Sequence, residues 1–188
     1  MRVRIWFGVG LAIFLFASSA VLWLGYRSSR YDEIIAQAVA RYNLDFYLVK
    51  ALIYEESWFR PDIRGAAGEL GLMQLTMRAA TDYCAHNGFP PLYEARVLDP
   101  RLNVEVGCWY LKQSMDRYKN SPSPTLFALL RYNAGEVRAD NWLRIALSKP
   151  LPAGISREQY YLSVVDFPTT RDYARRILAR SRSHNYWF

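Results

Sequence analysis

The chain has 188 residues, which is enough for one domain with a real hydrophobic core but short for two. Hydrophobic residues make up 52% of it and charged residues 22%, a composition that excludes a wholly disordered protein. The formal net charge of +7 suits an anionic partner, although a basic surface with no dedicated partner explains it equally well. Because the arginines are scattered and form no basic stripe, we expect no nucleic-acid-binding module.

The N-terminal segment is strongly apolar. Residues 5–26 carry no charge, and a stretch of this length can cross the hydrocarbon core of a bilayer as a helix. A cleavable signal peptide is the competing interpretation, because the small residues at 17–20 suit a cleavage site. The apolar run continues past that point to Leu24, so we favour an uncleaved membrane anchor over residues 1–30, followed by one globular domain over residues 31–188.

The rest of the chain is predicted to be all-α, with seven to nine helices. Apolar residues recur at helical spacing, Asp45 and Asp99 are placed to cap helices, and the alternation typical of strands is nearly absent. The glycines at 65, 68 and 71 predict a loop over about 60–71. The expected helices cover about 34–42, 45–58, 72–85, 99–118, 124–132, 136–147 and 169–181.

The chain has two cysteines, Cys84 and Cys108, and two histidines. Their spacing does not match that of metal ligands, so we expect no metal site. In an oxidising compartment the two cysteines can form a disulfide that closes a loop of about 24 residues, worth about 3 kcal/mol. Two buried thiols are the alternative; we favour the disulfide.

Two adjacent carboxylates, Glu55 and Glu56, lie in the bulky apolar stretch YEESWF. At about 100° per residue, Glu56 falls in the middle of the apolar stripe of its helix, whereas Glu55 falls a full step off the stripe and is expected in solvent. Burial raises the pKa of a carboxyl group, so Glu56 is a candidate general acid. A structural glutamate paired with an arginine is the competing interpretation of Glu56.

Four stretches in order resemble the lytic transglycosylases of the lysozyme superfamily. A Glu-Ser pair at 56–57 is followed by GLMQ at 71–74, by YNAG at 132–135 and by TTRDYARRIL at 169–178. LDPRLNVEVGCWYL at 98–111 also resembles the helix between the second and third motifs. The resemblance implies a lysozyme-like helical fold of the goose-type lysozyme and lytic transglycosylase class.

The resemblance also implies roles for residues and needs no cofactor. Glu56 would be the sole acid and base of the reaction, and Tyr173 would lie over its carboxyl group. The remaining positions would bind the glycan: Ser57, Met73, Gln74, Tyr132, Asn133 and Ala134.

The implied reaction cleaves the β-1,4 bond between N-acetylmuramic acid and N-acetylglucosamine. Glu56 would protonate the linking oxygen while the acetamide of the substrate attacks the anomeric carbon, and ionised Glu56 would then take the proton of the C6 hydroxyl as a 1,6-anhydro ring closes. The implied partners are peptidoglycan strands and the bacterial inner membrane, through residues 5–26, with the domain in the periplasm. A hydrolytic muramidase and a weakly active or non-catalytic glycan-binding scaffold remain as alternatives.

The chain departs from the family pattern at three positions. Gly65 stands where a serine is common, Glu69 where a small apolar residue is usual, and Met77 where a proline often occurs. The first two changes fall beside the expected glycan groove and are expected to affect efficiency or specificity.

Overall fold

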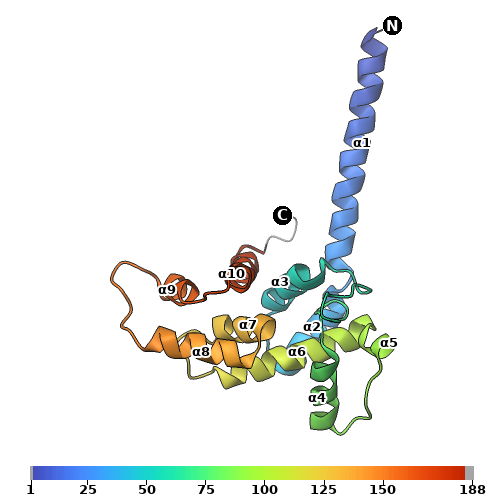
Figure 1. Ribbon diagram of the computed structural model, residues 1–188. Coiled ribbons are helices and arrows are strands. Elements are labelled where there is room, and N and C mark those ends of the chain that lie inside the picture. The colour runs from blue at the N-terminus through green and yellow to red at the C-terminus, as the bar shows by residue number, and fades with distance from the viewer. Residues whose placement is uncertain (1, 185–188) are drawn as a thin grey trace.

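The computed structural model describes the backbone of residues 2–184, and the side chains of residues 14–23 and 25–184. Within the described backbone all regular structure is helical apart from isolated bridges, which confirms the all-α prediction (Figure 1). The helices are α1 (Arg2–Ser29), α2 (Asp32–Tyr42), α3 (Phe46–Ser57), α4 (Met77–Asn87), α5 (Glu94–Val97), α6 (Pro100–Arg117), α7 (Pro124–Ala134), α8 (Glu136–Leu147), α9 (Arg157–Ser163) and α10 (Pro168–Ser183).

Helix α1 projects away from the body formed by the other helices (Figure 1). Among the residues whose side chains are described, no helix combines the length and the apolar character needed to cross a membrane. The predicted anchor, residues 5–26, lies partly outside those residues, at 5–13 and 24.

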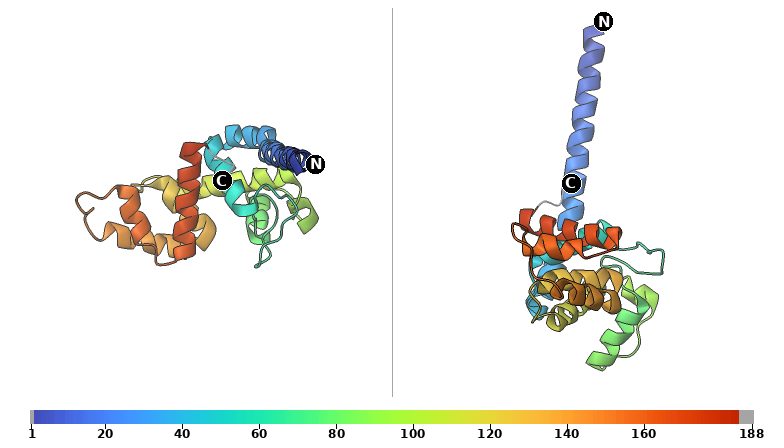
Figure 2. Two further views of the ribbon diagram at one scale, coloured as in Figure 1. Left: turned by 90° about the horizontal axis from the view of Figure 1, so that it is seen from above. Right: turned by 60° about the vertical axis from the view of Figure 1, so that its left-hand side comes forward.

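The body is built around α3, α6 and α7. Helix α3 packs against α10 on one side of the body, while α6 and α7 pack together on the other, and α10 also contacts α7 (Figure 2). Both predicted caps are present: the carboxylate of Asp45 accepts from the Leu48 amide at 2.6 Å, and that of Asp99 accepts from the Leu102 amide at 3.0 Å. These caps fix where α3 and α6 begin.

The helix predicted from Leu72 begins at Met77 instead. Leu70 and Leu75 exchange two backbone hydrogen bonds, at 2.9 and 3.0 Å, and close a tight turn between them. Gly71 and Gln74 have φ of +74° and +47° inside this turn, values that no helix contains. Thr76 then caps α4 by accepting from the Ala79 amide. Helices α5 and α9 were not predicted, because four and seven residues are too few to show a helical period.

The predicted disulfide is wrong in this structure. Cys84 on α4 and Cys108 on α6 are both free and buried. Sequence separation alone sets no direction for a thiol, and each one fills core space as a small apolar side chain. Burial raises the pKa of Cys108, so it remains a protonated thiol.

Candidate active site

Glu56 lies in the last turn of α3, where the chain leaves the helix sharply. Trp58 and Phe59 both have left-handed backbone angles, with φ of +55° and +57°. Two successive non-glycine residues in this region store strain, a feature typical of functional sites. The guanidinium of Arg30 donates to the Phe59 carbonyl at 3.3 Å and helps to hold the turn. Glu56 therefore lies at the end of α3, where it is half-buried against α10.

The carboxyl group of Glu56 is bonded to Tyr173. The phenol of Tyr173, on α10, donates to Oε1 of Glu56 at 2.5 Å. Desolvation raises the pKa of Glu56 to about 7; the Tyr173 bond lowers it, and the charges of Glu55 and Glu69 raise it further. The predicted raised pKa is therefore confirmed. Near neutral pH such a group can both give and accept a proton.

Two tyrosines border Glu56. Burial first, and then the charge of Glu56, raise the pKa of Tyr132 and of Tyr173 well above the ordinary value. Both phenols therefore stay protonated and act as hydrogen-bond donors. Tyr132 donates to the backbone carbonyl of Met73 at 2.8 Å, which ties the end of α7 to the GLMQ turn.

The side chain of Asn103, on α6, holds the GLMQ turn in place through hydrogen bonds. This fully buried amide accepts from the Met73 amide at 2.8 Å and donates to the carbonyls of Leu70 and Val97 at 2.9 and 2.8 Å. The Met73 side chain is also fully buried, and it fills the space that a Cβ on Gly107 would need. Met73 was predicted to line the glycan groove; its thioether is buried, and it contributes its backbone amide and carbonyl to the turn.

Gln74 stands at the edge of the same turn and is half-buried. Its amide nitrogen donates to the carbonyl of Gly71 at 2.9 Å and to that of Ile63 at 3.3 Å. Both amide hydrogens are therefore engaged by the turn, which leaves the amide oxygen as the group that Gln74 can offer to a ligand.

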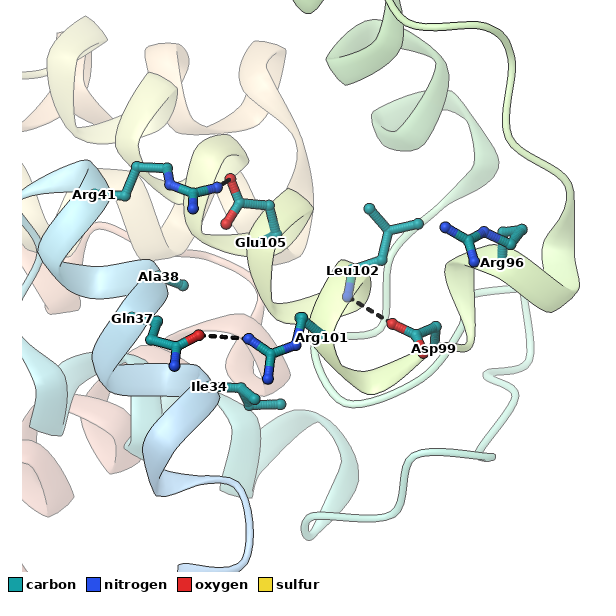
Figure 3. Close-up of a pocket in the computed structure, with 9 residues that line it drawn as sticks. All are labelled: Ile34, Gln37, Ala38, Arg41, Arg96, Asp99, Arg101, Leu102 and Glu105. Atoms are coloured by element: carbon teal, nitrogen blue, oxygen red, sulfur yellow. Dashed lines mark hydrogen bonds and ion pairs between the residues drawn. The ribbon is translucent and has the colours of Figure 1, made fainter.

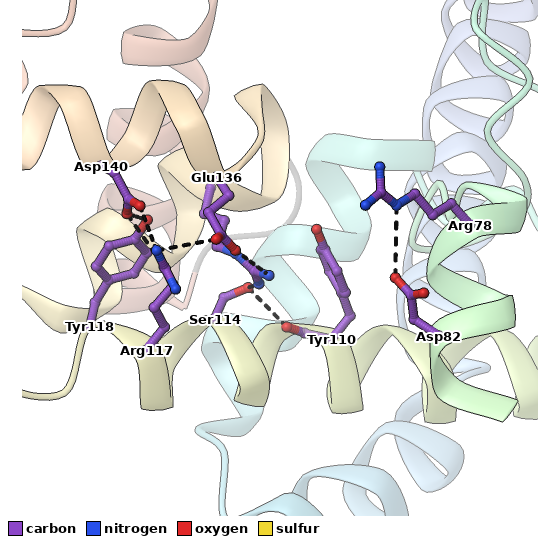
Figure 4. Close-up of polar contacts among 9 residues, drawn as sticks. Arg78, Asp82, Tyr110, Ser114, Arg117, Tyr118, Glu136 and Asp140 are labelled. Atoms are coloured by element: carbon purple, nitrogen blue, oxygen red, sulfur yellow. Dashed lines mark hydrogen bonds and ion pairs between the residues drawn. The ribbon is translucent and has the colours of Figure 1, made fainter. Parts of the chain in front are cut away.

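The YNAG stretch forms the end of α7. Asn133 accepts from the buried hydroxyl of Thr170 at 2.7 Å, which ties α7 to α10, and Ala134 is the last helical residue before Gly135, whose φ is +84°. A polar network on α6, α7 and α8 supports this end of α7 (Figure 4). In it the guanidinium of Arg131 donates to Ser114 at 2.6 Å and pairs with Glu136.

Two predictions on the YEESWF stretch need correction. Ser57 is 2% exposed and its hydroxyl donates to the Ile53 carbonyl at 3.0 Å, so it supports the end of the helix and does not reach a groove. Glu55 is not a solvated charge: its side chain is 14% exposed and pairs with Arg176 of α10. Both residues fix the geometry of the end of α3, on either side of Glu56.

Three supporting residues were missed in the sequence: Asn103, Thr170 and Arg176. An asparagine within the apolar run of α6 signals a buried amide with fixed partners, which could have been noticed. Thr170 and Arg176 carry no local signal, because their partners lie 37 and 121 residues away.

Elsewhere on the body, a cavity of about 270 Å³ lies between α2, α5 and α6, lined by Arg41, Arg96 and Arg101 among others (Figure 3). It contains none of the predicted site residues. Within the described part of the chain, no group of histidine, cysteine or acidic residues is arranged to hold a metal ion.

The comparison with protein families decides the family. Residues 33–150 match the transglycosylase SLT domain, which is more than half of the chain. The chain belongs to the SLT domain family. This match includes Glu56, the GLMQ turn and the YNAG stretch but ends before α10, so the place of Tyr173 rests on the geometry alone.

Individual relatives are distant and much longer than this SLT protein. A membrane-bound lytic murein transglycosylase F of Pseudomonas putida is 28% identical over 72% of the chain, and the soluble lytic murein transglycosylase of Escherichia coli is 24% identical over 84%. The chain spans only 29% and 23% of these two proteins.

Solved structures share the fold. A complex of the soluble lytic transglycosylase with bulgecin A covers 88% of the chain with a TM-score of 0.74 at 24% identity. A lytic transglycosylase from Pseudomonas aeruginosa covers 81% with a TM-score of 0.69 at 22% identity. These matches cover 26% and 23% of the two solved chains.

Proposed function

We propose that this SLT domain protein is a peptidoglycan lytic transglycosylase that cleaves the β-1,4 bond between N-acetylmuramic acid and N-acetylglucosamine and leaves a 1,6-anhydromuramic end. The observation that carries the proposal is the half-buried Glu56, whose pKa is about 7 and whose carboxyl oxygen is bonded to Tyr173 at 2.5 Å. The substrate class follows the names of the relatives, which are lytic murein transglycosylases.

In the proposed reaction Glu56 acts first as the acid. Its proton passes to the oxygen that links the two sugars, and the acetamide oxygen of the muramic sugar attacks the anomeric carbon as that bond breaks. The carboxylate left behind is stabilised by the Tyr173 hydroxyl, which keeps its proton because its own pKa is raised. Glu56 then takes the proton of the C6 hydroxyl, and that oxygen attacks the anomeric carbon as the bond to the acetamide oxygen breaks, which closes the anhydro ring, restores the acetamide and returns the carboxyl group to its starting state.

We further propose that Gln74, Tyr132, Asn133 and Ala134 border the glycan, with Tyr132 and Gln74 contributing polar groups beside Glu56. Met73 contributes its backbone, and Ser57 contributes support for the helix end. Glycan binding by aromatic rings and a few fixed polar groups is physically well suited to sugar faces and hydroxyls.

For its location we propose a single-pass anchor over residues 1–30 in the bacterial inner membrane, with residues 31–188 as the catalytic domain in the periplasm. The continuous helix α1, the uncharged run at 5–26 and the membrane-bound relatives support this arrangement. Protease accessibility of the domain in spheroplasts tests it: the domain should be digested from outside the inner membrane, and full protection would contradict the proposal.

The catalytic proposal is tested with purified sacculi and the full chain in detergent. The wild type should release muropeptides with 1,6-anhydro ends, which mass spectrometry separates from hydrolytic products because they lack one water. Glu56→Gln keeps the shape and removes the proton donor, so it should abolish release; Glu55→Gln changes a neighbouring carboxylate that pairs with Arg176, and it should retain turnover. Anhydro products from the Glu56 variant would overturn the assignment, and fully hydrated products from the wild type would favour the muramidase.

A further inference from the structure

Gly65 and Glu69 face each other across the hairpin that leads into the GLMQ turn. The Gly65 amide donates to the Glu69 carbonyl at 2.8 Å, and the Glu69 side chain folds back over Gly65. A Cβ placed on Gly65 would lie 2.2 Å from Oε2 of Glu69 and 2.7 Å from Oε1 of Gln74. Neither distance is possible for a real side chain, so Glu69 occupies the space that any residue larger than glycine would need at position 65.

The same contacts place two acceptor oxygens side by side. Oε2 of Glu69 accepts from the Ala67 amide at 3.0 Å, whereas its Oε1 accepts no hydrogen bond from the described residues. The amide oxygen of Gln74 likewise accepts no hydrogen bond from the described residues, and the two hydrogens of that amide are already donated to carbonyls of the turn. The side chains of Glu69 and Gln74 therefore offer a ligand two hydrogen-bond acceptors and no donor.

The negative charge of Glu69 is not balanced by a nearby cation among the described residues. Among the described residues Glu69 has no ion pair, whereas Glu55, the other carboxylate near Glu56, is paired with Arg176. Glu69 is half-buried and close enough to Glu56 for the two groups to interact electrostatically. A ligand group that brings positive charge and several hydrogens would satisfy both Glu69 and Gln74.

We propose that Glu69, together with the amide oxygen of Gln74, is a specificity-determining element of the glycan groove that selects a protonated primary amine on the substrate. An ammonium carries three donors and one positive charge, whereas an acetamide carries one donor and an acceptor oxygen that Glu69 would repel. Such an amine occurs on a glucosamine that lacks its acetyl group and on the free amino group of a peptide stem. The inference rests on the proposed function only in that the groove holds glycan.

The test is calorimetry with the full chain in detergent and two tetrasaccharides, chitotetraose and its fully de-N-acetylated form. A charge-assisted hydrogen bond predicts that the wild type binds the amine form about tenfold more tightly. Glu69→Gln, which keeps the shape but not the charge, should remove that preference. Asp62→Asn, which neutralises an exposed acid of the same loop, is the matched control and should keep it.

Equal wild-type affinities for the amine and acetylated forms in both the tetrasaccharide pair and the disaccharide-peptide pair, or an undiminished preference in Glu69→Gln, would overturn the proposal. Added salt screens an ion pair, so it should reduce the preference of the wild type for the amine form, and this measurement needs no variant. Stem amines are tested with a disaccharide-peptide before and after chemical acetylation of its amino group; a loss of affinity in this arm alone assigns the amine to the stem. A wild type that shows the preference but releases no anhydro product would refute the proposed function and leave this inference standing.

Discussion

The bond between Tyr173 and Glu56 gives a prediction with a calculable size. Tyr173→Phe removes the hydroxyl that donates to Glu56 at 2.5 Å and keeps the buried ring. A hydrogen bond to a charged group contributes about 1.5–3 kcal/mol, and one pKa unit corresponds to about 1.4 kcal/mol. Because this bond favours the ionised form, its loss should raise the pKa of Glu56 from about 7 by about one to two units.

The assay is the pH dependence of kcat/KM for release of anhydro muropeptides by the full chain. Activity in the first step requires protonated Glu56, so the rate should fall as pH rises through the pKa of Glu56. In Tyr173→Phe this alkaline limb should move to higher pH by the same one to two units. Tyr110→Phe is the control, because Tyr110 packs edge-on against Tyr132 and has no bond to Glu56 among the described contacts. An unmoved limb, or one displaced toward acid, would refute the reasoning.

Three further variants test the energetics of the site. The pKa of Glu56 is 4.5 in its ordinary state and about 7 in the fold, so its burial costs no stability below about pH 4.5 and costs progressively more as the pH rises to about 7. Glu56→Gln should therefore gain about 3 kcal/mol over the wild type at pH 8 and show no such gain at pH 4, by urea unfolding. Asn103→Leu leaves the Met73 amide and the Val97 carbonyl without a partner and removes one of the two hydrogen bonds to the Leu70 carbonyl, so it should lose about 3–5 kcal/mol in the same assay; a loss under about 1 kcal/mol would contradict the supporting role of Asn103. Arg176→Met removes the ion-pair partner of Glu55, so the charge of Glu55 should raise the pKa of Glu56 further. The alkaline limb of kcat/KM should therefore move to higher pH, and adding Glu55→Gln to Arg176→Met should cancel that shift.

Local signals in the sequence were sufficient to place Glu56. Asp45 caps α3, the apolar stripe sets the rotation of the helix, and together they put Glu56 in a desolvated position with a raised pKa. The partner of Glu56 could not be found in this way, because Tyr173 lies 117 residues away and only the motif order suggested it.

The errors have a common physical cause: a motif preserves a residue without saying which of its atoms is used. Met73 contributes its backbone carbonyl and amide to the site while its side chain fills the core beside Gly107. The hydroxyl of Ser57 likewise donates to a carbonyl of its own helix, that of Ile53. Both positions would tolerate little change, but for reasons of packing and helix termination, which a list of motif residues cannot distinguish from ligand contact.

A single carboxyl group can serve the proposed reaction as acid and then as base only if its pKa stays close to the working pH. In this fold opposing effects set that value for Glu56. Desolvation and the charges of Glu55 and Glu69 favour the protonated form, while the Tyr173 hydroxyl favours the ionised form. Since Glu55 is paired with Arg176 and Glu69 is not, Glu69 is the charge that a bound cation would most strongly neutralise. An amine bound at Glu69 would therefore lower the pKa of Glu56 as it binds, which couples the choice of substrate to the protonation of the catalytic group.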